Sequence, residues 1–160
     1  MTLADSTKRR LHVQGFDSVA DDDLVRVEPW LRLTPAVCGL IVAIGTLLAA
    51  PGVFFALAPI AALGAMFPVH PFDLAYNHGM RRVTGTRPLP PNGAPRRFAC
   101  ALGAVWITLA GVMFVVEAPV AGYVLGGMLV TMAALVATTH ICIPSMMFRA
   151  GCRVAGMRSA

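Results

Sequence analysis

Two long segments of this 160-residue chain contain no lysine or arginine, and they constrain its fold more than any other feature. They are residues 33–80 and 98–148, and all 13 basic residues lie before, between or after them. Each segment has room for two membrane-spanning helices of about 20 residues. Turn-forming residues interrupt the segments at Ala50-Pro51-Gly52 and at Glu117-Ala118-Pro119. The sequence therefore predicts an all-α membrane protein in which four transmembrane helices form two hairpins.

Composition and charge distribution support this interpretation. Hydrophobic residues make up 57% of the chain and charged residues 13%, whereas about 25% of a soluble domain is charged. Because basic loops remain in the cytoplasm, both termini and the central loop are predicted to be cytoplasmic. The net charge of +5 comes from residues beside the apolar segments. We therefore expect these residues to contact anionic lipid headgroups rather than nucleic acid.

The chain divides into five predicted segments. They are an N-terminal cytoplasmic tail (1–29), a first transmembrane hairpin (30–80), a basic Pro-rich cytoplasmic loop (81–97), a second transmembrane hairpin (98–148) and a basic C-terminal tail (149–160). The four helices are expected at Trp30–Ala49, Pro51–Val69, Phe98–Val116 and from Pro119 or Val120 to Ile143. We expect the N-terminal tail to be solvated and partly mobile. The alternative is that it docks onto a partner or onto the protein's own loops.

A pair of glycines in the predicted fourth helix is typical of close helix packing. Gly122 and Gly126 have the Gly-x-x-x-Gly spacing, which lets two helix backbones approach each other within a membrane. The contact can lie inside this bundle or between this chain and another subunit. The sequence leaves both possibilities open.

Reactive and polar side chains of the apolar segments are unevenly distributed. Those predicted at cytoplasmic helix ends or in the cytoplasmic loop are Cys38, His70, Asp73, His78, Cys100, His140 and Cys142. The opposite side of the membrane is predicted to carry a single ionisable residue, Glu117. A functional site, if there is one, should therefore face the cytoplasm.

One chemistry that this cluster can support is cofactor binding. His70, His78 or His140 can serve as an axial ligand to haem or to a chlorophyll-type pigment, because imidazole nitrogen is a common ligand. Closely spaced pairs such as Cys-x-x-Cys or His-x-x-x-His are absent from the sequence. The sequence therefore predicts no metal site.

Redox chemistry is a second possibility, with Cys142 and Cys100 as candidate catalytic residues. If Cys142 ends the fourth helix, the helix dipole makes its thiol less reactive. If Pro144 starts a new helix, the thiol precedes a helix amino terminus and becomes more reactive. The third possibility is that the cysteines are small buried residues and the histidines cap helices. Cys152, in the basic tail, is a further candidate for lipid attachment.

Several short motifs resemble those of a family of small bacterial four-helix membrane proteins with a domain of unknown function. The motifs are His70-Pro71-Phe72-Asp73, Tyr76-Asn77-His78, Arg96-Arg97-Phe98-Ala99 and the cysteine motif at Cys142, and the resemblance covers about residues 27–152. It implies a multi-pass protein of the bacterial inner membrane. The family pattern ends the fourth helix with Phe-Cys-x-x-Cys, whereas this chain has Ser145 in the second cysteine position. Cys142 is then left with Cys100 or Cys38 as its nearest possible partner.

The middle of each predicted span carries no charged residue, which favours a non-catalytic role. We expect an accessory or structural subunit that packs against a larger membrane assembly, such as a respiratory or photosynthetic electron-transfer complex, or against another copy of itself. The alternative is a thiol-based redox or sulfur-handling membrane protein that uses Cys142. A small transporter is a third hypothesis, disfavoured because transport paths usually contain intramembrane ionisable residues. The sequence shows no catalytic signature, so it favours a protein that is not an enzyme.

Overall fold

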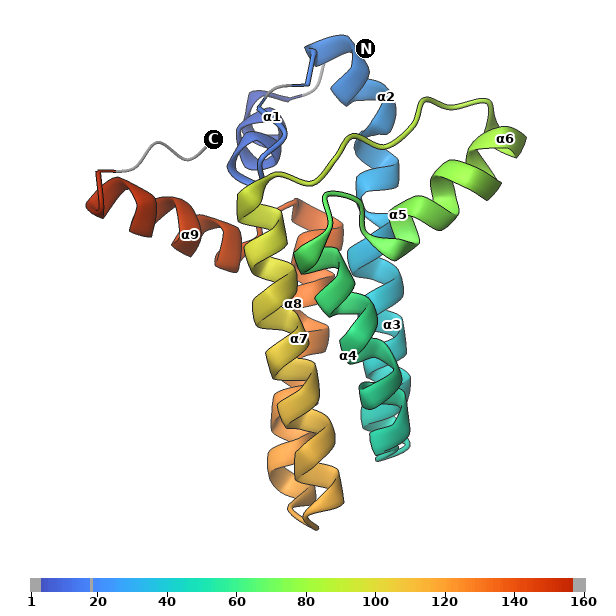
Figure 1. The fold of residues 1–160 in the computed structure, drawn as a ribbon, viewed down its shortest axis with the longest axis vertical. Coiled ribbons are helices and arrows are strands. Elements are labelled where there is room, and N and C mark those ends of the chain that lie inside the picture. Colours follow the sequence, from blue (N-terminus) through green and yellow to red (C-terminus); the bar gives the residue numbers. More distant parts are fainter. Residues whose placement is uncertain (1–3, 18, 157–160) are drawn as a thin grey trace.

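The computed structural model describes residues 4–17 and 19–156, and these residues form helices and connections without any β-strand. Long helices run side by side in a bundle, and shorter helices gather at one of its ends (Figure 1). The bundle consists of α3 (Leu33–Leu47), α4 (Pro51–Met66), α7 (Ala94–Val115) and α8 (Pro119–Thr139). The prediction of an all-helical chain is confirmed for the described residues.

Several of these helices are long and apolar enough to cross a membrane. Three stretches of the described chain qualify: Asp21–Leu47, which contains α2 (Asp21–Leu31) and α3, together with α7 and α8. A fourth is obtained when α4 is joined to Pro71–Val83, although the chain bends by 84° between the two parts. The second helix was predicted to extend to Val69, but α4 ends three residues earlier, at Met66. The reason is that Phe67 precedes a proline and is therefore driven into an extended conformation.

Short turns join α3 to α4 and α7 to α8, where the sequence predicted them. The backbone is left-handed at Ala49 (φ 46°) and at Glu117 (φ 55°). Pro51 and Pro119 then begin α4 and α8, where the missing proline N–H costs no intrahelical hydrogen bond. Both turns lie at the end of the bundle that is far from the N-terminus (Figure 1).

The bundle is held together by an apolar core between α3, α4 and α7. Its buried members are Val42, Phe54, Leu57, Ala61, Ile107 and Ala110. Glycines let the neighbouring helices approach this core. A Cβ atom added at Gly126 would clash with Thr46 of α3, and one added at Gly122 would lie 2.8 Å from the ring of Phe114. The Gly122/Gly126 pair therefore serves contacts inside this bundle.

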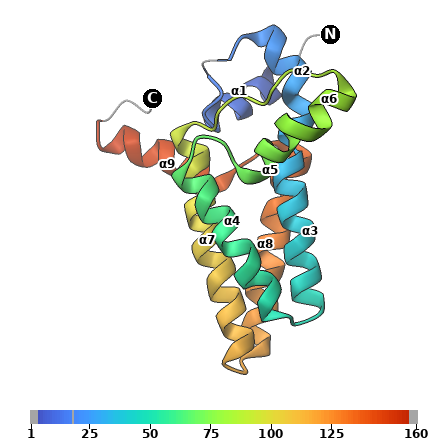
Figure 2. The same cartoon turned by 45° about the vertical axis from the view of Figure 1, so that its right-hand side comes forward.

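The N-terminal segment differs from the expected solvated tail. α1 (Asp5–Val13) and α2 lie over one end of the bundle (Figure 2) and form a second apolar core there. Its buried members are Leu11, Phe16, Leu24, Val27, Leu31, Tyr76 and Leu89. On α2 the apolar residues recur at helical spacing and share one face, which buries against this core. The segment thus docks onto the protein's own connecting loops.

Hydrogen bonds fasten this N-terminal segment to the end of α8. Arg10 Nη1 donates to the carbonyl of Thr139 at 2.8 Å, and Gln14 Nε2 donates to the carbonyl of His140 at 2.8 Å. The last carbonyl groups of a helix have no partner within the helix. The two side chains therefore satisfy groups that burial would otherwise leave without partners.

The chain between α4 and α7 crosses the same end of the bundle. It forms α5 (Pro71–Ala75), the π-helix η1 (Tyr76–Met80), α6 (Arg81–Thr84) and an extended segment up to Gly93. Asn77 Oδ1 accepts a hydrogen bond from the Leu89 N–H at 2.8 Å, which holds the extended segment against η1. α7 begins at Ala94 rather than at the expected Phe98, because Pro95 is compatible with the first turn of a helix.

The predicted fourth helix ends earlier than expected, and a separate helix follows it. α8 ends at Thr139 instead of Ile143, and α9 (Ile143–Val154) follows it. His140 takes a left-handed conformation (φ 57°) that ends α8. α9 then projects sideways from the bundle (Figures 1 and 2). Part of the predicted C-terminal tail, up to Val154, is therefore helical, while residues 157–160 lie outside the described part of the chain.

Candidate functional site

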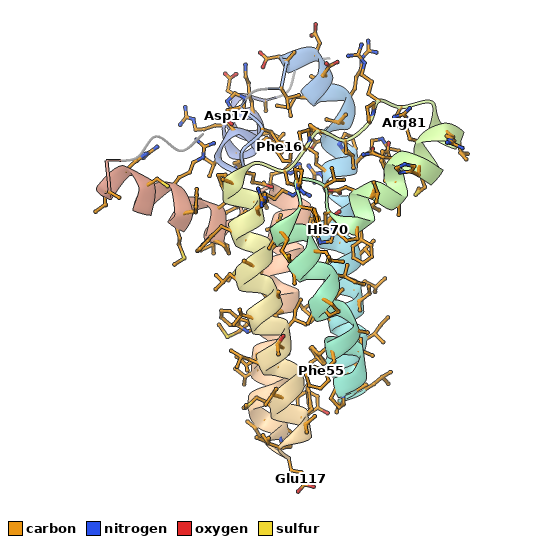
Figure 3. The ribbon with its side chains drawn as sticks, viewed as in Figure 1. Phe16, Asp17, Phe55, His70, Arg81 and Glu117 are labelled. Atoms are coloured by element: carbon orange, nitrogen blue, oxygen red, sulfur yellow. The ribbon has the colours of Figure 1, made fainter. Side chains whose placement is uncertain are left out.

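A cavity of about 290 Å³ lies between α3, α7 and α8, beside the start of α9. His70, in its wall, lies at the opposite end of the bundle from Glu117 (Figure 3). The wall residues that carry reactive or polar groups include Cys38, His70, Arg96, Cys100, Trp106 and Cys142. Most of the remaining wall consists of aliphatic and methionine side chains. We call this space the thiol cavity, because it collects three of the four cysteines from three different parts of the chain.

Cys142 occupies the N-cap position of α9. Its backbone is extended (φ −112°, ψ 99°) and the residue is 8% exposed. Of the two arrangements that the sequence allowed, the structure therefore has the one in which a new helix starts after Cys142. A helix amino terminus favours negative charge nearby. The Ser145 hydroxyl lies 3.1 Å from Cys142 Sγ and provides a hydrogen bond to the sulfur.

Cys100 and Cys38 bring two further thiols to the cavity. Cys100 lies in the second turn of α7 and Cys38 in α3, and both are partly buried. Both residues line the same cavity as Cys142. Cys152, on α9, is not part of the cavity wall.

A buried ion pair lies next to the thiols. Arg96 Nη2 is 4.0 Å from Asp73 Oδ2, and the two side chains are 9% and 3% exposed. Asp73 also accepts hydrogen bonds from Thr34 Oγ1 at 2.5 Å and from Asn92 Nδ2 at 3.4 Å. The guanidinium group stacks over Phe16, 5.2 Å from the ring centre. Arg96 Nη1 is buried and has no hydrogen-bond partner among the described residues.

His70 enters the cavity wall from the loop that follows α4. Its Nδ1 accepts a hydrogen bond from the Phe72 N–H at 3.3 Å, and its ring packs where a Cβ on Gly64 would clash. Burial lowers the pKa of His70 to about 4; Asp73 opposes this effect and Arg96 adds to it. The imidazole is therefore neutral at physiological pH.

His140 belongs to a separate polar cluster that connects α2 to the end of α8. Its Nε2 lies 2.6 Å from Glu28 Oε1, and Arg32 Nη2 donates to the same oxygen at 2.6 Å. Arg32 Nη1 also donates to the carbonyl groups of Ala137 and Thr138. Burial lowers the pKa of His140, although the hydrogen bond to Glu28 raises it. A neutral His140 therefore donates its Nε2–H to the carboxylate.

The three candidate cofactor-binding histidines do not meet in one place. His70 lines the thiol cavity and His140 pairs with a carboxylate, whereas His78 is exposed with its Nδ1 3.0 Å from the carbonyl of Leu74. Within the described residues, no three His, Cys, Asp or Glu side chains are close enough to hold a metal ion. Of these histidines, His70 is the one that shares a cavity with the candidate thiols.

Two residues of the cavity wall that carry hydrogen-bond donors were not among the predicted site residues. They are Arg96 and Trp106, and the indole Nε1 is buried without a partner among the residues that the structure describes. The sequence did contain one signal for Arg96, namely two adjacent arginines at the start of an apolar helix. Neighbouring side chains on a helix point in different directions, so the two arginines cannot both face the same way. Arg97 accordingly turns away and donates to the carbonyl groups of Ala65 and Met66.

A second hollow lies on the outer face of the bundle, between α4 and α7. Its volume is about 410 Å³ and its wall is apolar except for one hydroxyl. The lining residues are Ala58, Pro59, Ala62, Ala104, Val105, Thr108 and Leu109. We call it the outer groove. It offers packing space but no reactive group.

Comparison with known proteins assigns most of the chain to one family. Residues 27–153 match the model of DUF4395, which is described as a domain of unknown function. No curated protein and no solved structure matches the chain. The match covers the bundle, the lining residues of the thiol cavity other than Gln14, and nearly all of α9.

Proposed function

Because this chain belongs to the DUF4395 family, whose function is unknown, we propose its function from the thiol cavity: it is a membrane-embedded thiol-redox protein that uses Cys142. The observation that carries this proposal is the convergence of Cys38, Cys100 and Cys142 on one cavity. Thiol exchange requires a thiolate and a second sulfur within reach. In this proposal Cys142, at the start of α9, is the attacking sulfur, and Cys100, which lines the same cavity, is the second.

The proposal places the protein in the bacterial inner membrane, with four spans in two hairpins and both termini in the cytoplasm. Large apolar side chains exposed along the bundle support it, since they suit a lipid environment. They include Leu40, Leu47, Phe55, Val105, Leu109 and Val124. The basic residues lie toward the end that carries Arg81, and Glu117 lies at the other end (Figure 3). The positive-inside rule then places the thiol cavity near the cytoplasmic surface.

The proposed reaction is exchange with a disulfide R–S–S–R′. The Cys142 thiolate attacks one sulfur, a Cys142–S–S–R bond forms, and R′–S⁻ leaves. The Cys100 thiolate then attacks Cys142 Sγ, which forms a Cys100–Cys142 disulfide and releases R–S⁻. Two protein thiols are oxidised and one disulfide of the substrate is reduced. The reverse sequence oxidises a dithiol substrate.

The reaction can be tested with the apolar disulfide 4,4′-dithiodipyridine, which releases one ultraviolet-absorbing thiopyridone at each attack. All proteins carry Cys152→Ala, so that the thiol outside the cavity does not contribute. We expect two thiopyridones per protein together with a Cys100–Cys142 cross-link in peptide mass spectra. Cys142→Ala should slow the release about tenfold or more, because the attacking thiolate is gone. Cys100→Ala should stop at a mixed disulfide on Cys142.

Two results would change this proposal: the first contradicts the use of Cys142, and the second contradicts the role of Cys100. One is an unchanged release rate in Cys142→Ala, which would show that another thiol starts the reaction. The other is a protein disulfide on Cys142 that still forms in Cys100→Ala, which would give the second step to Cys38. Intact mass distinguishes the products, because a mixed disulfide adds the mass of one thiopyridyl group and an internal disulfide removes two hydrogens.

A role as an accessory subunit is a second candidate, and the outer groove is the observation that favours it. Its wall contains small residues, which allow close helix packing in membranes. The occupant would be a transmembrane helix of a larger electron-transfer assembly or of a second copy. Native mass spectrometry after extraction in mild detergent tests this candidate. A partner at fixed stoichiometry, lost in Ala104→Leu, would support it, and a protein that remains a monomer would speak against it.

A further inference from the structure

We propose that the substrate of the thiol cavity is a small, uncharged disulfide dissolved in lipid, and that it enters sideways past α8 and α9 rather than from the end of the bundle that α1 covers. The substrate class rests on the proposed thiol exchange, whereas the route of entry does not. The proposal starts from a difference within the cavity wall, whose polar residues are buried and whose exposed residues are apolar.

The exposed residues of the cavity wall come from two helices. Met128 and Met132 of α8 are 44% and 38% exposed, and Ile143 and Met147 of α9 are 39% and 59% exposed. Since each of these side chains lines the cavity and also reaches the outer surface, the wall is one side chain thick there. Methionine side chains are unbranched and flexible, so a small molecule can pass between them. We call these four residues the lateral mouth.

Buried side chains and hydrogen bonds close the end of the cavity nearest α1. Gln14 and His70 line the wall and are buried. Gln14 Nε2 donates to the carbonyl of His140 at 2.8 Å, and Arg149 Nε donates to the carbonyl of Val13 at 3.0 Å. These bonds hold the end of α1 against the end of α8 and against α9. A substrate that arrived from water at this end would have to break them before it reached the thiols.

The residues of the lateral mouth favour an uncharged molecule. Their aliphatic and thioether side chains cannot replace the water around a charged group, and removing an ionised group from water without a partner is costly. The mouth also continues an apolar surface, because Val124 lies one helical turn before Met128 on α8 and is 55% exposed. In the proposed membrane arrangement this surface faces lipid. The substrate is therefore expected to dissolve in lipid.

The volume and the reactive groups of the cavity define the substrate further. About 290 Å³ is close to the lower limit of about 300 Å³ for small-molecule sites, so the cavity accommodates a small disulfide. Cys38, Cys100 and Cys142 belong to the same wall, so a disulfide inside the cavity lies beside the thiols. The bonds that form and break are those of the exchange with R–S–S–R′.

The route of entry can be measured by alkylation of Cys142 with two maleimides that share a reactive ring and differ in charge. N-phenylmaleimide is uncharged, and 4-maleimidobenzoate carries a carboxylate at neutral pH. The protein retains Cys142 as its single thiol, with alanine at the other three cysteines, and is held in nanodiscs of neutral lipid, where water reaches both faces. In the reference protein the single thiol is Arg82→Cys, on the exposed side of α6.

The two labelling rates of Cys142 are each divided by the rate of the same probe at the reference thiol. The resulting ratio should favour N-phenylmaleimide about tenfold or more, because the carboxylate of the other probe would have to leave water. We call this ratio the apolar preference. Because the measurement needs one thiol and no disulfide, it does not depend on thiol exchange.

Matched variants test whether the probe passes the lateral mouth. Met132→Trp places a larger side chain in the mouth and should remove most of the apolar preference. Val124→Trp is the control, because Val124 is exposed on the same helix but does not line the cavity, and it should retain the preference. Met132→Ala widens the mouth and should speed labelling by N-phenylmaleimide, which keeps the test decisive where Met132→Trp does not fold.

Each outcome decides the proposal. An apolar preference that falls in Met132→Trp and persists in Val124→Trp supports lateral entry, as does faster labelling in Met132→Ala. Equal rates for the two maleimides relative to the reference thiol, or rates that do not change at Met132, overturn it. Failure of the proposed function gives a different result. If labelling depends on the lateral mouth but 4,4′-dithiodipyridine releases no thiopyridone, thiol exchange is wrong and the substrate class falls with it.

Discussion

The hydroxyl of Ser145 lies 3.1 Å from the sulfur of Cys142, within the first turn of α9. The same hydroxyl lies 3.2 Å from the carbonyl oxygen of Pro95 at the start of α7. A hydroxyl has one proton, so it can donate to one of these acceptors at a time. When Cys142 is a thiolate, donation to the charged sulfur is the stronger bond. Ser145 can thus stabilise the reactive form of Cys142 without being able to form a disulfide with it.

Replacing that hydroxyl with a thiol should create a disulfide. Ser145→Cys places a second sulfur in the position of an oxygen that is already 3.1 Å from Cys142 Sγ. The longer C–S bond shortens this separation toward the S–S bond length of about 2.05 Å. After mild oxidation we expect peptide mass spectra to show a cross-link between Cys142 and the introduced thiol. Met146→Cys, at a position whose side chain is 51% exposed, is the control and should remain free. A reduced Cys142 in oxidised Ser145→Cys would show that α9 starts differently.

The stability of the folded protein should fall as the solution becomes acidic. In the unfolded chain, histidine has a pKa of about 6.5, whereas burial lowers the pKa of His70 to about 4 in the fold. Between these two pH values the unfolded state binds a proton at His70 more readily than the folded state does. The free energy of unfolding therefore declines as the pH falls from 6.5 toward 4, and above pH 6.5 the contribution of His70 is not reduced. The loss attributable to His70 reaches about 3 kcal/mol. His140, whose pKa burial also lowers, adds to the decline.

Thermal unfolding in detergent at a series of pH values measures this effect. His70→Gln removes the titrating group and should flatten the curve between pH 6.5 and 4, although it lowers stability at neutral pH. His78→Gln is the control, since His78 is exposed, and its curve should follow that of the parent protein. A curve for His70→Gln that falls as steeply as the parent would assign the acid sensitivity to other residues.

The helices that form the bundle could be predicted from the sequence because their causes are local. Uncharged runs of sufficient length specify apolar helices, and Pro51 and Pro119 specify where the second helix of each turn begins. The same pattern of apolar segments and turns predicted that Cys38, Cys100 and Cys142 lie near one end of the bundle. The predictions of an all-helical fold and of long apolar helices are confirmed for the described residues. Membrane insertion and orientation stay predictions.

The remaining features depend on contacts between residues that are far apart in the chain. The N-terminal helices dock through pairs such as Arg149 with the carbonyl of His12, which are separated by 137 positions. The division between α8 and α9 was ambiguous, since Pro144 is compatible with either a helix end or a helix start, and the left-handed His140 decides it. Arg96 and Trp106 were not among the predicted site residues, because their place in the cavity wall depends on how α7 packs against other parts of the chain.

The contact between α3 and α8 at Gly126 should tolerate no larger residue. A Cβ there clashes with the Thr46 side chain, which is itself bonded to the carbonyl of Val42 at 2.8 Å and cannot turn away without losing that bond. Gly126→Val should therefore destabilise the protein by about 1–3 kcal/mol. Gly127→Val is the matched control, because a Cβ at Gly127 meets no atom within 4 Å. Equal melting temperatures for the two variants would mean that α3 and α8 do not pack here.

The proposed orientation predicts which end of the bundle is accessible from outside the cell. Glu117 lies in the turn at the end far from His70 (Figure 3), and no basic residue lies between 98 and 148 to hold that turn in the cytoplasm. In intact cells, Glu117→Cys in a Cys152→Ala background should react with a membrane-impermeant maleimide. The parent protein, which retains Cys152 near the basic end, should react only after the membrane is opened, because moving its arginines across the bilayer is too costly. Labelling of Cys152 in intact cells, with Glu117→Cys protected, would invert the topology and place the thiol cavity on the periplasmic side.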